Sequence, residues 1–124
     1  MLERVETTRT KFSKQEMTKA LINAWYNVFN SFPKKEQIGI IFAQWSLETG
    51  QGQYCWNYNI GNYKAKDIPG KTVKYVALNN VWEIINGKKV ILGKEDPGSW
   101  FLAFDSLEDG VIEHLKKLSG QRLK

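Results

Sequence analysis

The spacing of apolar residues predicts a helix near the start of the chain. Between residues 17 and 29 they recur at intervals of three and four, which is typical of a helix with one buried face. Ser13 and Glu16 stand in front of this stripe in the arrangement of a capping box. Because Pro33 disfavours helical geometry in the residue before it, the helix should end near Phe32.

A second apolar stripe predicts a second helix, with Pro33 in its first turn. The stripe consists of Ile38, Ile41, Phe42 and Trp45. This helix should end at Glu48-Thr49-Gly50, with Gly50 as its C-terminal cap. From Gln51 to Gly70 the helical period disappears and Gly, Asn, Tyr and Lys become frequent, so an ordered loop is expected there. Loops of this kind often carry function.

Stretches rich in β-branched residues predict a small antiparallel sheet in the second half of the chain. Asn86-Gly87 is a strong signal for a hairpin between two of its strands, and Asp96-Pro97-Gly98 predicts a turn after them. The expected strands are 72–76, 81–85 and 89–92.

A last helix is predicted after the apolar segment 100–104. It should begin at Asp105 or Ser106, carry its apolar stripe over 107–118, and end at Ser119-Gly120.

The order helix, helix, loop, sheet, helix predicts an α+β fold with segregated parts. A length of 124 residues suits one domain, 13–124, preceded by an arm at 1–12 that has no clear period and should be extended or frayed. The chain stops soon after the last helix. Three alternatives stay open: a compact variant, a piece of a larger protein, or a chain that an additional domain or partner chain completes.

Composition excludes several kinds of site. The chain has one cysteine, Cys55, and one histidine, His114, so it forms no internal disulfide and no structural zinc site, and we expect no metal and no cofactor. A Cys55 nucleophile activated by His114 is an alternative. A half-buried structural cysteine is the preferred interpretation. His114 is expected at the surface, compensating the helix dipole.

The net charge of +5 favours polyanionic partners such as nucleic acid, acidic lipid or anionic wall polymer. A run of lysines at residues 64, 66, 71 and 74 fits a solvated face better than a specific contact with such polymers. No apolar run approaches the roughly 18 residues of a membrane span. The charged N-terminus does not resemble a signal peptide.

Glu48 is the strongest candidate for chemistry. It follows Trp45 by three residues and Ile41 by seven, which predicts that its side chain points toward the interior. Desolvation there and the negative end of the helix dipole would favour its protonated form. A general acid for glycoside cleavage needs this property.

The neighbourhood of Glu48 carries two linked motifs. The first is Ala-Gln-x-x-Leu-Glu-Thr-Gly-x-Gly at 43–52, and the second joins Tyr-Asn to Gly-x-x-Lys-Ala at 58–65. Together they resemble glycoside hydrolase family 73, the N-acetylglucosaminidase type that includes the muramidase domain of flagellar assembly proteins. A weaker likeness at 101–106 has Leu102 where the family usually has Arg. The resemblance covers about 14–118 and implies a lysozyme-like fold, with a mainly helical lobe, a small β-hairpin lobe and a cleft between them.

The resemblance also implies roles. Glu48 matches the catalytic acid, and Tyr58 and Asn59 match residues that line the sugar groove. Asn62 departs from the commoner apolar residue at its position, where an amide could bind an N-acetyl group or a hydroxyl. Sugar-stacking platforms are expected among aromatic residues, each of which fits the core equally well. These are Trp56, Tyr58, Tyr63 and Trp82, whereas Trp25 and Trp45 are assigned to the core.

A second carboxylate must come from the sheet or its turns, because residues 51–66 contain no Asp or Glu. Glu83, on a predicted strand, is the first choice, and a solvent-facing strand position is its alternative role. Other candidates are Glu95, Asp96 and Asp67. If no carboxylate faces Glu48, a lytic transglycosylase, which can work with one acid/base, fits the sequence.

The resulting hypothesis is cleavage of peptidoglycan glycan strands between N-acetylglucosamine and N-acetylmuramic acid, at the cell wall or in association with phage. A non-catalytic wall-binding module is one alternative. A nucleic-acid binder is another, which no recognisable nucleic-acid motif supports.

Overall fold

The computed structural model describes residues 1–120 of the chain, so the last four residues of the expected domain 13–124 lie outside it. The fold is α+β, as predicted, and the described residues form three α-helices and five short strands. The helices are α1 (Lys14–Phe29), α2 (Lys35–Thr49) and α3 (Leu107–Ser119). The strands are β1 (Leu2–Arg4), β2 (Val73–Ala77), β3 (Val81–Ile85), β4 (Lys88–Leu92) and β5 (Trp100–Leu102), and a 3-10 turn, η1, spans Pro97–Ser99.

Local capping residues set the helix boundaries. The predicted capping box at the start of α1 is present, with the Ser13 hydroxyl accepting from the Glu16 amide at 3.0 Å and the Glu16 carboxylate accepting from the Ser13 amide. The helix ends before Phe32, because Asn30 adopts a left-handed conformation and closes it. Pro33 precedes the cap of α2 and does not occupy its first turn, so that prediction was wrong. Gly50 closes α2 in the left-handed conformation, as predicted.

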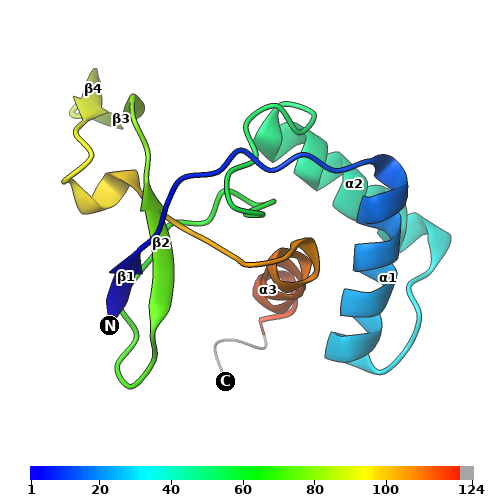
Figure 1. Ribbon diagram of the computed structural model, residues 1–124. Coiled ribbons are helices and arrows are strands. Elements are labelled where there is room, and N and C mark those ends of the chain that lie inside the picture. The colour runs from blue at the N-terminus through cyan, green and yellow to red at the C-terminus, as the bar shows by residue number, and fades with distance from the viewer. Residues whose placement is uncertain (121–124) are drawn as a thin grey trace.

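The main core lies among the three helices. α1 and α3 pack together, and Figure 1 shows α3 between α1 and the sheet of β1, β2 and β5. The apolar stripes of all three helices meet there, together with two residues of the loop after α2. The fully or almost fully buried members include Met17, Leu21, Ala24, Ile41, Cys55, Ile60, Val111 and Leu115.

The N-terminal arm is extended and paired over much of its length. β1 pairs in parallel with β2, and β2 pairs antiparallel with β5. Further along, the Thr10 amide donates to the Cys55 carbonyl at 3.0 Å, and Asn57 bonds the backbone of Glu6 and Thr8. Figure 1 shows the arm running from the sheet to the start of α1. The predicted 72–76 strand therefore belongs to this mixed sheet and is separate from the hairpin.

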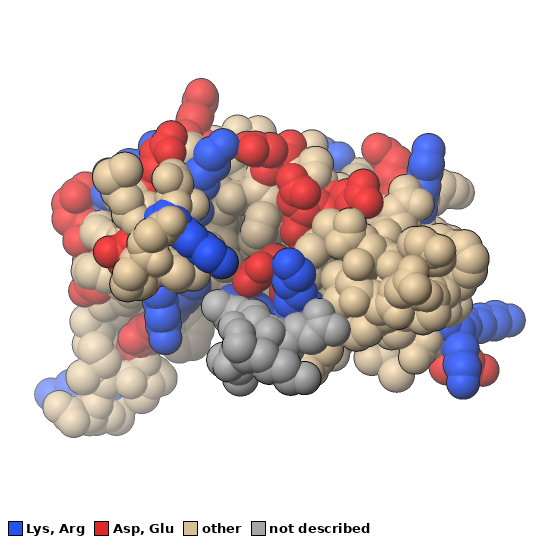
Figure 2. All heavy atoms as spheres, turned by 90° about the horizontal axis from the view of Figure 1, so that it is seen from below, with Lys and Arg blue, Asp and Glu red and all other residues tan. Residues whose placement is uncertain are grey.

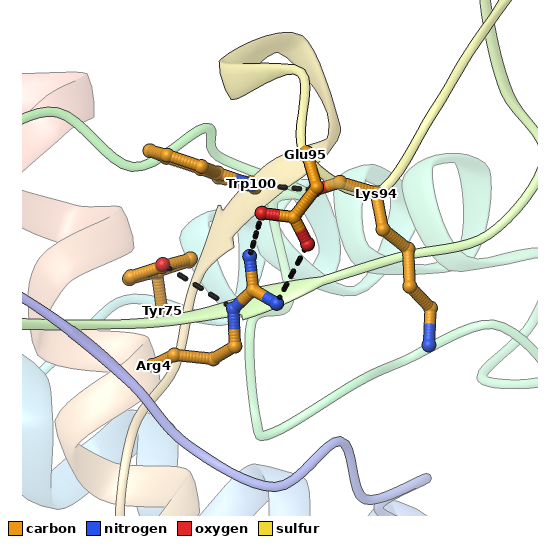
Figure 3. A network of polar contacts seen from close by, with 5 residues as sticks. All are labelled: Arg4, Tyr75, Lys94, Glu95 and Trp100. Carbon is orange, nitrogen blue, oxygen red and sulfur yellow. Dashed lines mark hydrogen bonds and ion pairs between the residues drawn. The ribbon is translucent and has the colours of Figure 1, made fainter.

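The predicted hairpin is present as β3 and β4, joined at Asn86 and Gly87, both of which have positive φ. Its base is fixed to the three-stranded sheet (Figure 3). Arg4 donates to the Glu95 carboxylate at 3.1 Å and to the Tyr75 hydroxyl at 3.3 Å, and the Trp100 indole donates to the Lys94 carbonyl at 2.7 Å. The hairpin itself projects beyond the sheet, away from the helices (Figure 1).

Candidate functional site

Glu48 lies in the last turn of α2 and is exposed, so the prediction that its side chain points into the interior was wrong. The buried face of α2 runs through Ile41, Trp45 and Thr49, which follow one another at intervals of four. Glu48 stands beside that stripe, at the helix end where less chain covers it. Its carboxylate has no hydrogen bond or ion pair with any residue from Met1 to Gly120.

The second motif contacts the helix end that carries the first. The Asn62 side-chain amide donates to the backbone carbonyl of Glu48. Gln51 and Asn62 have positive φ, as do Asn57 and Tyr58, so the loop reverses direction several times between α2 and β2. The two motifs that were linked by sequence spacing are therefore in direct contact.

Asn59 supports this loop from inside the protein. It is 2% exposed, and its amide nitrogen donates to the carbonyls of Tyr63 (2.9 Å) and Leu102 (3.0 Å), while its oxygen accepts from the Tyr63 amide at 3.0 Å. Both ends of the amide are thus occupied by backbone groups. The expected role of Asn59 as a residue lining the groove is wrong, because a buried side chain whose polar atoms all have partners does not face a ligand.

A buried polar chain connects the loop with α2 and α3. His114 is 3% exposed, its Nδ1 is 2.7 Å from the Tyr63 hydroxyl, and its Nε2 is 3.0 Å from Oε1 of Gln44. Because Oε1 only accepts, Nε2 carries the proton and Nδ1 accepts from Tyr63. Burial, with a smaller effect of Lys117, lowers the pKa of His114 to about 4. The expected surface location of His114 is wrong: the α3 position it occupies faces this loop.

Tyr63 is held on two sides. Its hydroxyl bonds His114, and the Lys117 ammonium lies 3.9 Å from the centroid of its ring. The ring is partly exposed, so part of its surface reaches solvent. Of the expected stacking residues, Tyr58 and Trp56 are likewise partly exposed on the same loop.

Two glycines allow this region to pack closely: Gly61, which the sequence predicts only as part of the second motif, and Gly110, for which no role was predicted. A side chain at Gly110 would bring its Cβ to 2.0 Å from the Tyr58 carbonyl oxygen, so α3 and the loop meet backbone to backbone. A Cβ at Gly61 would come 2.3 Å from the Tyr63 ring. For Gly110 the signal in the sequence was a glycine inside a predicted helix, which often marks close packing.

Glu83 lies in β3, and its carboxylate forms an ion pair with Lys64, the lysine of the second motif. Both side chains are about 40% exposed. The other candidate second carboxylates are also engaged: Glu95 with Arg4, Asp67 with the N-terminal amine, and Asp96 with the Gly98 amide.

Trp82 and Glu83 cannot both face the same side. Successive residues of a strand point to opposite faces, and Glu83 points toward Lys64. Trp82, which is 54% exposed, therefore points away from that loop. This geometry argues against the expected role of Trp82 as a sugar platform beside Glu83.

Cys55 is fully buried, and burial raises the pKa of its thiol above the usual value. Its side-chain neighbour is the Thr10 hydroxyl, 3.6 Å from the sulfur. This environment fits a structural cysteine, which is more deeply buried than predicted, and disfavours the thiolate that a nucleophile needs.

The charge distribution does little to distinguish between the possible classes of binding partner. Figure 2 shows acidic and basic side chains mixed on one face and a broad uncharged area on the side of α1. The face drawn in Figure 2 has no stripe of a single charge sign, the feature that favours nucleic-acid binding. Within residues 1–120 no group of three His, Cys, Asp or Glu side chains is arranged to hold a metal ion. No helix in the same range is long and apolar enough to cross a membrane.

Comparison with known proteins leaves this geometry as the basis for assigning a function. No protein-family model, no curated protein and no solved structure matches the chain.

Proposed function

We propose that the protein cleaves the glycan strands of peptidoglycan, at the β-1,4 bond between N-acetylglucosamine and N-acetylmuramic acid, with Glu48 as the general acid. One observation carries the proposal. The Glu48 carboxylate is open to solvent and unengaged by any described residue, while its backbone carbonyl is bonded by Asn62 from the second motif. A carboxylate that has no protein partner, on a backbone position held by Asn62, is available to a substrate oxygen.

The proposed substrate groove is a lysozyme-like cleft between the helices and the strands. Asn62 and Tyr63 would form its floor near Glu48, with Tyr58 and Trp56 further along the loop. The buried hydrogen bonds from Tyr63 to His114 and from His114 to Gln44 support this arrangement, because they fix the hydroxyl end of the Tyr63 side chain. A sugar strand bound over Glu48 would exclude water from the site, which strengthens the hydrogen bond between its carboxyl group and the glycosidic oxygen.

The second carboxylate decides between two mechanisms. Hydrolysis with two carboxylates needs Glu83 or another acid to act on the opposite face of the sugar. Glu83 is paired with Lys64, so it would have to exchange that partner for a water molecule or the sugar. This pairing favours the alternative of a lytic transglycosylase, in which Glu48 alone serves as acid and base and a hydroxyl of the substrate closes an anhydro ring.

The experiment compares the wild-type chain with Glu48→Gln on purified peptidoglycan, scoring released fragments by mass spectrometry. We expect activity to fall by about 10² to 10⁴ fold in Glu48→Gln, the usual contribution of general acid catalysis. Glu36→Gln is the matched control, since Glu36 is an exposed glutamate in the first turn of the same helix. Full activity in a folded Glu48→Gln variant would overturn the assignment.

The same digests separate the mechanisms. Anhydro ends that persist in Glu83→Gln identify a transglycosylase, whereas reducing ends that disappear with Glu83→Gln identify a two-carboxylate hydrolase. If the wild-type chain sediments with peptidoglycan without cutting it, the protein is a wall-binding module.

A further inference from the structure

The β3–β4 hairpin carries an apolar face that no other part of the described chain covers. In its register Trp82 lies opposite Ile91, and Ile84 lies opposite Lys89, so these four side chains share one face. Trp82, Ile84 and Ile91 are 54%, 62% and 64% exposed. Ile85, next to the turn on the opposite face, is exposed as well. Monomeric proteins rarely leave such a cluster in water without a partner for it.

The position of the hairpin presents this face outward. Glu83, on the opposite face, is paired with Lys64 of the loop, so the Trp82 face looks away from the proposed groove. The Arg4–Glu95 pair and the Trp100 indole fix the base of the hairpin to the sheet (Figure 3). The tip therefore projects from an anchored base.

The charges on the hairpin are basic. Lys89 lies on the Trp82 face, with its ammonium 4.9 Å from the centroid of the Trp82 ring, whereas Lys88, opposite Ile85, lies on the other face next to the turn. The only acid between residues 81 and 92 is Glu83, which Lys64 pairs. An indole and two isoleucines on one face of the hairpin, with Lys89 on that face and Lys88 at the turn, match a bilayer surface, which has an apolar interior beneath negatively charged headgroups.

We propose that this face of the hairpin docks on an anionic lipid bilayer, with Trp82, Ile84 and Ile91 entering the headgroup region, and with Lys89 on the same face and Lys88 at the turn contacting lipid phosphates. A polyanionic polysaccharide fits less well, because isoleucine side chains offer it no hydrogen bond and stay hydrated against it. A second copy of the chain also fits less well, since a symmetric contact through this face would bring lysines together. The proposal does not depend on glycan cleavage.

The test is co-sedimentation of the whole chain with vesicles of phosphatidylcholine alone or mixed with phosphatidylglycerol. We expect binding only to the mixed vesicles. Ile84→Asn and the double change Lys88→Gln with Lys89→Gln should each weaken it about tenfold, by loss of buried apolar area and of phosphate attraction. Two matched controls should bind like wild type: Ile40→Asn, at an apolar residue 57% exposed on α2, and Lys11→Gln with Lys19→Gln, at exposed lysines elsewhere.

A second measurement reports insertion directly. Brominated lipids in the mixed vesicles should quench part of the tryptophan fluorescence, and the quenched part should be absent in Trp82→Phe, leaving the other four tryptophans unaffected. Three outcomes would overturn the proposal. The first is equal binding of the wild type and the hairpin variants to the mixed vesicles. The second is binding to linear polyphosphate that Ile84→Asn leaves unchanged, with no quenching by the brominated lipids. The third is self-association of the chain without lipid that Ile84→Asn abolishes.

Discussion

The two regions that carry the candidate carboxylates are built in opposite ways. Around Glu48, the loop after α2 and α3 are joined by buried polar groups, with Asn59 and His114 almost fully enclosed and every polar atom of their side chains bonded. Around Glu83, the hairpin exposes its apolar side chains and is held by exposed ion pairs, Arg4–Glu95 at its base and Lys64–Glu83 along β3. The first region should therefore contribute to the stability of the whole domain, and the second should act mainly as a surface.

The largest effect is expected for Gly110→Ala. The new Cβ would sit 2.0 Å from the Tyr58 carbonyl oxygen, so α3 and the loop must separate, and the free energy of unfolding should fall by about 3 kcal/mol or more. Gly39→Ala is the matched control in an open position of α2, where alanine should add about 0.5 to 1 kcal/mol. Urea unfolding of both variants measures the difference. Equal stabilities would show that the loop does not pack on α3.

Asn59→Ala comes next. It removes a buried side chain that bonds two partly buried carbonyls and one amide, and we expect a loss of about 2 to 3 kcal/mol in the free energy of unfolding. Asn62→Ala removes a single bond to the Glu48 carbonyl at a less buried position and should cost about 1 kcal/mol or less. Urea unfolding of the two variants measures both losses. A cost for Asn59→Ala no larger than that for Asn62→Ala would contradict a supporting role for Asn59.

The sequence predicted correctly those features of the fold that depend on neighbouring residues, namely helix caps and the hairpin turn. The box at Ser13 and Glu16, the cap at Gly50 and the hairpin at Asn86-Gly87 all depend on residues within a few positions of one another. β1 escaped prediction because it is three residues long and gains its pairing from β2, about 70 positions later. No periodicity in the arm encodes that partner.

The site was predicted less completely than the fold. Sequence spacing linked the two motifs, which are in contact through Asn62 and the Glu48 carbonyl. It misplaced the Glu48 side chain, because a residue on the flank of an apolar stripe becomes buried only if another element covers the helix end. It also missed the burial of His114, since that depends on Tyr63 and Gln44, which approach α3 from two other segments.

The pH dependence of stability tests the burial of His114 between Tyr63 and Gln44. Because the folded-state pKa of His114, about 4, lies below its unfolded value of about 6.5, the unfolded state takes up a proton first as the pH falls. The free energy of unfolding should therefore drop by about 2 kcal/mol between pH 7.5 and pH 5. The chain has no other histidine, so His114→Gln should flatten this slope when urea unfolding is repeated across the range. An unchanged slope in the variant would indicate that His114 is accessible to protons in the folded state.

The smallest effect is expected at the hairpin, although its residues are as apolar as those of the core. Ile84 and Ile91 are more than 60% exposed, so Ile84→Asn and Ile91→Asn remove little area that folding buries, and each should change the free energy of unfolding by less than about 0.5 kcal/mol. Leu115→Asn, at a residue 1% exposed in the helical core, provides the contrast, since it buries an amide without a partner and should lose about 3 kcal/mol or more. Urea unfolding of the three variants tests this difference directly. A large loss in either hairpin variant would mean that the apolar face packs within the folded domain in solution, and it would then be closed to lipid as well.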